Sequence, residues 1–231
     1  MPREILDQKI QHLLDEILVL DSMVEQATID AVDALKRRDV ETAKRVYFGD
    51  KAINSKRFDL ENETMITIAT QQPIMGSDLR LLASILEVTG ELERMGDYAK
   101  GIAKICVMTG GQPPVKPLID IPRMQEIVVR MLHEAVGAFV AQDVEVARRV
   151  PKDDDEVDAL YNQVYRELVT VILANPSKID GANFLMWAAH NLERMADRVT
   201  NICERTIYVV TGEMSEIDVS DDELKLSKYK T

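Results

Sequence analysis

Apolar residues recur at the spacing of one helix face along most of this chain. The pattern predicts six long helices, over residues 5–35, 40–71, 79–108, 122–141, 144–174 and 181–211. Short links join them, so consecutive helices have no slack and must pack antiparallel, because a helix rises only about 1.5 Å per residue. The chain is therefore predicted to be all-α and elongated.

Polar and helix-breaking residues mark the links between these helices. Asp39 is placed to cap the second helix, and Ser77 is a candidate N-cap of the third. Residues 109–114, Thr-Gly-Gly-Gln-Pro-Pro, stop the third helix, and Pro176 separates the last two. The segment 109–114 is expected to link two halves of the protein.

The chain repeats itself after about a hundred residues. Residues 92–97, Leu-Glu-Arg-Met-Gly-Asp, return at 192–197 as Leu-Glu-Arg-Met-Ala-Asp. Residues 39–44 reappear as 143–148, at an offset of 104. Similarity at a fixed offset over such a length indicates an internal duplication.

The duplication fixes the expected domain organisation. Residues 1–114 and 115–213 are predicted to form two tandem three-helix bundles, each a copy of the other. The remaining segment, 214–231, is polar and is expected to fray.

Composition narrows the classes of function. Hydrophobic residues make up 46% of the 231 residues and aromatic residues only 5%, which suits aliphatic helices. A net charge of −12 argues against a nucleic-acid surface, which needs clustered Lys and Arg. Since no leader or membrane-spanning run is evident, we expect a cytoplasmic protein. Cys106 and Cys203 are expected to be buried, reduced thiols.

Each copy of the repeated motif places two acids four residues apart, on one face of a helix. If the first hairpin folds near Ile74, Asp50 lies 24 residues before the turn and Asp97 lies 23 after it. Asn54 and Glu93 reach a common level in the same way. Folding the second hairpin near residue 176 gives the same match. The sequence thus predicts two oxygen-rich patches, Asp50, Asn54, Glu93 and Asp97 in the first copy and Asp154, Asp158, Glu193 and Asp197 in the second.

Clustered carboxylates require a positive charge nearby, because like charges 4 Å apart cost about 1 kcal/mol per pair even in bulk water. The candidates are a multivalent metal ion and the neighbouring Arg94, Arg194 and Arg198. All-oxygen ligands favour hard ions such as Fe(III), Mn, Mg or Ca, with borderline Zn also admitted. A solvated, salt-bridged face is the alternative, but its duplication favours metal binding.

The three histidines add little to these patches. His12 and His133 sit on amphipathic helices, where a solvated or core role is favoured over ligation. His190 lies three residues before Glu193 and could touch the second patch, although we favour a position away from it.

The repeated motif resembles that of the PhoU family of phosphate-transport regulators. The similarity extends to residues 49–51, 77–80 and 201–204 and covers nearly the whole chain to about Gly212. The turn from Pro73 to Asp78 is a residue longer than the usual family form. Asn54 also departs from the second copy, which has Asp158, so weaker metal binding is expected at the first patch.

The resemblance implies two tandem three-helix bundles with multinuclear metal clusters, of iron, zinc or another hard or borderline divalent ion. It also implies a non-enzymatic adaptor that links the ATPase subunit of a phosphate ABC transporter to a sensor histidine kinase and represses the phosphate-starvation response. A homodimer is expected. The competing interpretations are a di-iron, oxygen-activating enzyme and a metal-binding structural scaffold, but the single His190-x-x-Glu193 reverses the usual di-iron order.

Overall fold

The computed structural model describes residues 2–71 and 73–217 of the chain. Helices account for nearly all of these residues, and no strand occurs among them. The elements are α1 (Pro2–Arg37), α2 (Val40–Thr70), α3 (Gly76–Thr109), α4 (Asp120–Ala141), α5 (Val144–Arg149), η1 (Val150–Asp153), α6 (Asp154–Ala174), η2 (Pro176–Lys178) and α7 (Ile179–Thr211).

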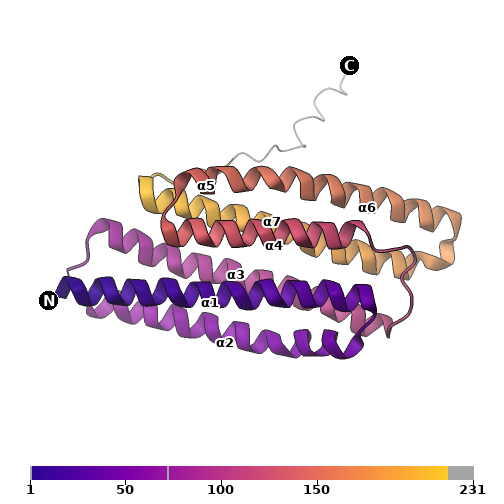
Figure 1. The fold of residues 1–231 in the computed structure, drawn as a ribbon, viewed down its shortest axis with the longest axis horizontal. Coiled ribbons are helices and arrows are strands. Elements are labelled where there is room, and N and C mark those ends of the chain that lie inside the picture. Colours follow the sequence, from indigo (N-terminus) through magenta and orange to yellow (C-terminus); the bar gives the residue numbers. More distant parts are fainter. Residues whose placement is uncertain (1, 72, 218–231) are drawn as a thin grey trace, which may run out of the picture.

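These helices form two three-helix bundles that lie side by side in one elongated body (Figure 1). The first bundle contains α1, α2 and α3, and the second contains α4, the α5-to-α6 segment and α7. The predicted all-α fold with its duplicated bundle is confirmed. Of the polar tail predicted from residue 214, the part from 218 onward lies outside the described residues.

The turn after the first helix of each bundle shows the duplication at the level of the backbone. Arg38 and Gln142, which are equivalent at the offset of 104, both adopt a left-handed conformation, with φ of 62° and 53°. In each turn the next residue, Asp39 or Asp143, caps the following helix by accepting hydrogen bonds from two backbone N–H groups. Asp39 is thus confirmed as an N-cap.

Two details of the helix boundaries differ from the prediction. The helix expected over 144–174 is interrupted by η1, because Pro151 has no N–H to donate and its ring crowds the preceding turn. Ser77 is not an N-cap: α3 starts one residue earlier, and Met75 at the cap position makes no side-chain cap bond.

The seam between the bundles is formed by α1 against α4 and by α3 against α7. Aliphatic side chains fill this seam and the interiors of both bundles, and together they form one continuous core. Ion pairs cross it as well, with Arg205 Nε 2.7 Å from Glu87 Oε2. Cys106 and Cys203 are free and buried, as expected. Within the described part of the chain, no helix is long and apolar enough to cross a membrane.

Candidate metal centres

The first predicted patch lies between α2 and α3. Asp50 is only 3% exposed, and its Oδ2 accepts a hydrogen bond from Asn54 Nδ2 at 3.0 Å. Burial raises the pKa of the Glu93 carboxyl, Arg57 opposes that rise, and the charges of Asp97 and Asp50 add to it. The hairpin therefore brings the four predicted residues to one place, which we call the first cluster.

Two basic side chains already balance the first cluster. Lys100 Nζ donates a hydrogen bond to Asp50 Oδ2 at 2.7 Å and lies 3.4 Å from Asp97 Oδ1. The hydrogen bond with Asp50 is the main reason why the pKa of Lys100 is raised. On the other side, Arg57 Nη1 lies 3.8 Å from Glu93 Oε1. Sequence reasoning missed both, although Lys100 stands one helical turn after Asp97.

The second predicted patch lies where α6 begins, against α7. Asp154 is 4% exposed, and burial, followed by the charges of Asp158, Asp197 and Glu193, raises its pKa to about 7. Burial and the charge of Asp197 likewise raise the pKa of Glu193 to about 7. All four predicted acids thus interact with one another, and they form the second cluster.

The second cluster lacks the internal cations of the first. At the positions equivalent to Lys100 and Arg57 stand the uncharged Thr200 and Tyr161. Asp154 Oδ1, Glu193 Oε2 and Thr200 Oγ1 are all buried without a hydrogen-bond partner. Such orphaned oxygens are costly in a protein interior and disfavour the charged form of these carboxyls.

The three arginines that were expected to offset the acidic patches add little positive charge to the second cluster. Arg194 Nη1 pairs with Asp197 Oδ2 at 2.8 Å, at the exposed edge of the second cluster. Arg94 instead pairs with Glu91, and Arg198 reaches the same Glu91 across the seam at 3.4 Å. Among the described residues, only Arg194 of the three forms an ion pair with a cluster carboxylate.

His190 lies closer to the second cluster than expected. Its Nδ1 is 3.2 Å from Glu193 Oε2, although the two atoms form no hydrogen bond. The expectation of a position away from the cluster was therefore wrong. One imidazole next to four carboxylates adds a possible nitrogen ligand to an otherwise all-oxygen set.

The donor sets fit a multivalent cation at the second cluster better than at the first. Both clusters contain buried carboxylate oxygens without a hydrogen-bond partner, Asp50 Oδ1 in the first and Asp154 Oδ1 and Glu193 Oε2 in the second. In the first cluster, however, Lys100 already pairs with the other oxygen of Asp50. In the described part of the chain, neither cluster brings ligand atoms of three His, Cys, Asp or Glu residues within 4.8 Å of one another. Like charges hold carboxylates apart, so an ion would have to draw them together.

Comparisons with a family model and with known proteins point to the same family. The family model of the PhoU domain matches residues 17–106 and again 121–206. A phosphate-specific transport system accessory protein PhoU homolog of Clostridium acetobutylicum is 33% identical over 221 residues, which is 96% of this chain and 100% of that protein. The Escherichia coli phosphate-specific transport system accessory protein PhoU is 31% identical over 89% of this chain and 85% of its own length.

Solved structures show the same architecture. The crystal structure of PhoU from Pseudomonas aeruginosa superposes with a TM-score of 0.84 at 31% identity, over 90% of this chain and 99% of that one. The phosphate transport system regulatory protein PhoU from Streptococcus pneumoniae also gives a TM-score of 0.84, at 27% identity, over 92% of this chain and 100% of that one.

Proposed function

The chain belongs to the PhoU family, and from that premise we propose that it is a cytoplasmic regulator of phosphate uptake that restrains the phosphate-starvation response. It would do so by linking a phosphate ABC transporter, through the ATPase subunit, to a sensor histidine kinase. The observation that carries the proposal is the similarity, over nearly the whole chain, to accessory proteins of phosphate-specific transport systems.

The family consists of regulatory accessory proteins and not of enzymes, which confirms the expectation that this chain is not an enzyme. The di-iron enzyme considered above would need a Glu-x-x-His pair on each of two helices. The single contact between His190 and Glu193 does not supply that arrangement. The competing enzyme interpretation is therefore set aside.

The second cluster supports a metal-dependent form of this regulator. Four interacting carboxylates with orphaned oxygens would hold a hard or borderline ion such as Fe, Mn or Zn. Asp154 and Glu193 would supply buried oxygens, while Asp158 and Asp197 would close the set. A bound ion would tie the start of α6 to α7 and thereby stiffen the second bundle.

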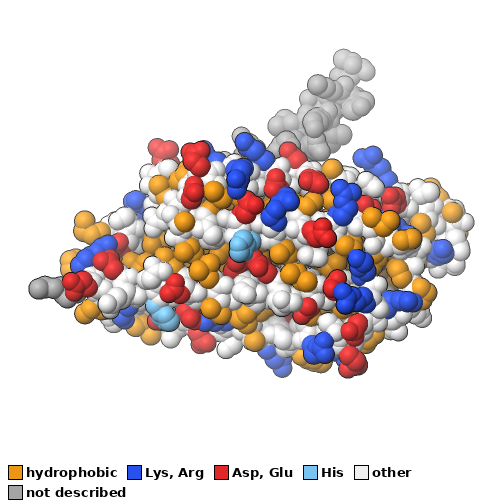
Figure 2. Space-filling view, viewed as in Figure 1, with side chains coloured by type: hydrophobic (Ala, Val, Ile, Leu, Met, Phe, Trp, Pro, Cys, Tyr) orange, Lys and Arg blue, Asp and Glu red, His pale blue; other side chains and the backbone are white. Residues whose placement is uncertain are grey.

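Surface charge suggests what kind of partner face the protein would meet. Acidic and basic side chains alternate over the face seen in Figure 2, within a chain of net charge −12. Partners should therefore offer basic or mixed-charge faces, and added salt should weaken the association, because exposed charges are screened beyond about 8 Å at physiological ionic strength. The expected homodimer stays a prediction.

A deletion strain grown in high phosphate tests the regulatory role. We expect starvation genes to be expressed in the deletion strain and silenced again by the wild-type gene. Complementation with a gene that carries Glu193→Gln and Asp197→Asn tests whether this regulation needs the metal site. Glu145→Gln, at an exposed position, is the matched control. Pull-down at low and high salt should recover the transporter ATPase and a histidine kinase. Recovery of neither, with unchanged starvation-gene expression, would contradict the proposal.

A further inference from the structure

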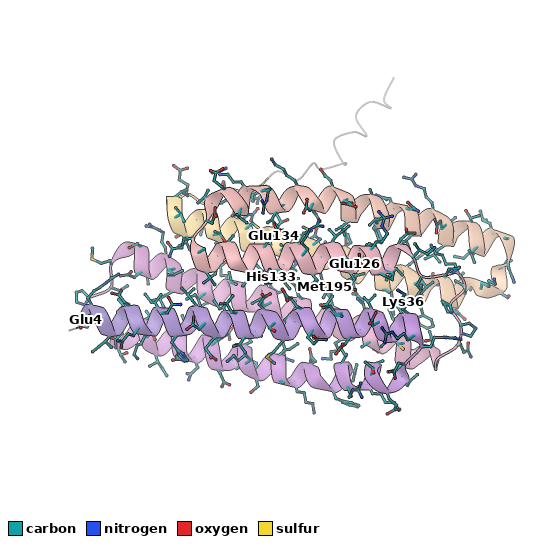
Figure 3. The ribbon with its side chains drawn as sticks, in the orientation of Figure 1. Glu4, Lys36, Glu126, His133, Glu134 and Met195 are labelled. Atoms are coloured by element: carbon teal, nitrogen blue, oxygen red, sulfur yellow. The ribbon has the colours of Figure 1, made fainter. Side chains whose placement is uncertain are left out.

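A third group of possible ligands lies outside both acidic clusters, on the seam between the bundles. Asp21 and Glu25 stand one turn apart on α1, and His133 stands on α4. One ligand atom from each lies within 4.8 Å of the other two. In the described part of the chain, this is the one group of three or more His, Cys, Asp or Glu side chains that meets this criterion. Figure 2 shows histidine atoms beside acidic atoms at this seam, and Figure 3 labels His133 there.

The buried member of the group has an unsatisfied oxygen. Asp21 is only 4% exposed, and its Oδ1 makes no hydrogen bond. No ion pair among the described residues reaches Asp21. Burial, with a smaller contribution from the charge of Glu25, raises the pKa of Asp21 to about 8. The Oδ1 atom therefore lacks a hydrogen-bond partner and the carboxylate lacks a counter-charge, and a cation would supply both.

The other two members complete a mixed ligand set that is open to solvent. His133 Nδ1 lies 3.1 Å from Glu25 Oε1, so the imidazole already faces the carboxylates. The His133 side chain is 76% exposed, which leaves a path for an ion and room for water ligands. Two carboxylates and one imidazole suit a borderline ion such as Zn²⁺, which commonly takes three protein ligands and a water.

The site belongs to the assembled pair of bundles and not to either copy. The residues equivalent to Asp21 and Glu25 in the second copy are Gln125 and Val129, and the residue equivalent to His133 in the first is Ile29. No second set of these ligands can therefore exist by symmetry. An ion at this place would join α1 of the first bundle to α4 of the second.

We propose that Asp21, Glu25 and His133 form a binding site for a single divalent transition ion of the Zn²⁺ type, which clamps the seam between the two bundles. The site is independent of the two acidic clusters and of the regulatory role proposed above.

Zinc titration of tag-free, chelator-treated protein tests the site. To isolate it, calorimetry uses a background in which Glu93, Asp97, Glu193 and Asp197 are replaced by Gln or Asn. We expect one Zn²⁺ per chain in that background, a loss of affinity of at least about 100-fold in His133→Ala, because one of three protein ligands is removed, and a similar loss in Asp21→Asn. His12→Ala is the control, since His12 pairs with Glu63 away from the site.

A second readout separates a site on the seam from incidental zinc binding. Saturating Zn²⁺ should raise the melting temperature of the background protein and of His12→Ala, but not that of His133→Ala. Co²⁺ in place of Zn²⁺ should give visible absorption that His133→Ala abolishes. Equal zinc affinity and stoichiometry with and without His133, or equal loss in both histidine variants, would overturn the proposal.

Discussion

Replacing Lys100 with threonine, the residue at the equivalent position 200, tests whether a side-chain cation takes the place of a metal ion in the first cluster. Lys100 Nζ lies 2.7 Å from Asp50 Oδ2. Two unit charges about 4 Å apart interact by about 1 kcal/mol in bulk water and about 4 kcal/mol at an effective dielectric constant of 20. A divalent ion doubles these values. Lys100→Thr should therefore improve ion affinity at the first cluster by at least about 2 kcal/mol, or roughly 30-fold.

Calorimetry with Mn²⁺ measures this effect, in protein whose second cluster is disabled by Glu193→Gln and Asp197→Asn and whose seam site is disabled by His133→Ala. Lys104→Thr is the matched control, because Lys104 is exposed one turn further along α3. The reciprocal change, Thr200→Lys in an otherwise intact second cluster, should weaken Mn²⁺ binding there by a similar factor. Unchanged affinity in both Lys100→Thr and Thr200→Lys would refute the argument.

The same variant should be less stable when no metal is present. Lys100→Thr leaves the buried Asp50 without its ion-pair partner, and because the Lys100 side chain is itself partly exposed, we expect a cost of about 1 to 3 kcal/mol. Saturating Mn²⁺ should restore much of that loss, because the ion binds only the folded chain. Urea denaturation with chelator and with Mn²⁺ gives both values. A variant as stable as the wild type in chelator would show that Lys100 and Asp50 contribute no net stability.

Three other predictions follow from groups on this structure. Without metal, the free energy of unfolding should fall by a few kcal/mol as pH rises from about 4 to about 7. The folded chain keeps protons on Asp154 and Glu193, whose pKa values are both about 7, whereas the unfolded chain releases them. Urea titrations at several pH values would contradict this if stability rose over the same window. Asp39→Ala and Asp143→Ala should each cost about 1 kcal/mol through loss of an N-cap, against a smaller effect of the exposed Glu145→Ala, as measured by chemical denaturation. Both cysteines should resist a thiol reagent in the folded protein and react in denaturant, since burial raises the pKa of Cys203 to about 12; fast reaction of the native protein would count against this packing.

Much of the fold was predictable because its signals are local. Helical periodicity, the turn residues and the repeated motif all lie in short stretches of sequence, and each predicts its own element. The interruption at Pro151 carried a local signal as well, but Ala147, Val150 and Val157 keep a helical spacing on either side of it and concealed the break. α3 begins at Gly76, three residues before the predicted start at 79, and its start carries no side-chain cap that the sequence could have signalled.

The acidic clusters were only partly predictable, for a physical reason. The level of a residue in an antiparallel hairpin follows from counting, and this brought Asp50 to Asp97 and Asp154 to Asp197. Which cations reach those levels depends on rotamers and on burial, so Lys100 and Arg57 were overlooked. The group on the seam was invisible to any argument within one repeat, because it needs α1 and α4 to pack together.

The two copies show how one buried acidic arrangement can be balanced in two ways. The fold places an aspartate inside each hairpin, Asp50 in the first and Asp154 in the second, and each is less than 5% exposed. A buried carboxylate must gain a positive partner or take up a proton. In the first copy Lys100 supplies the positive partner of Asp50. In the second copy Thr200 supplies none, and the pKa of Asp154 rises to about 7 instead. We therefore expect the second cluster to respond to protons and to cations more strongly than the first, in which the pKa of Glu93 is also raised.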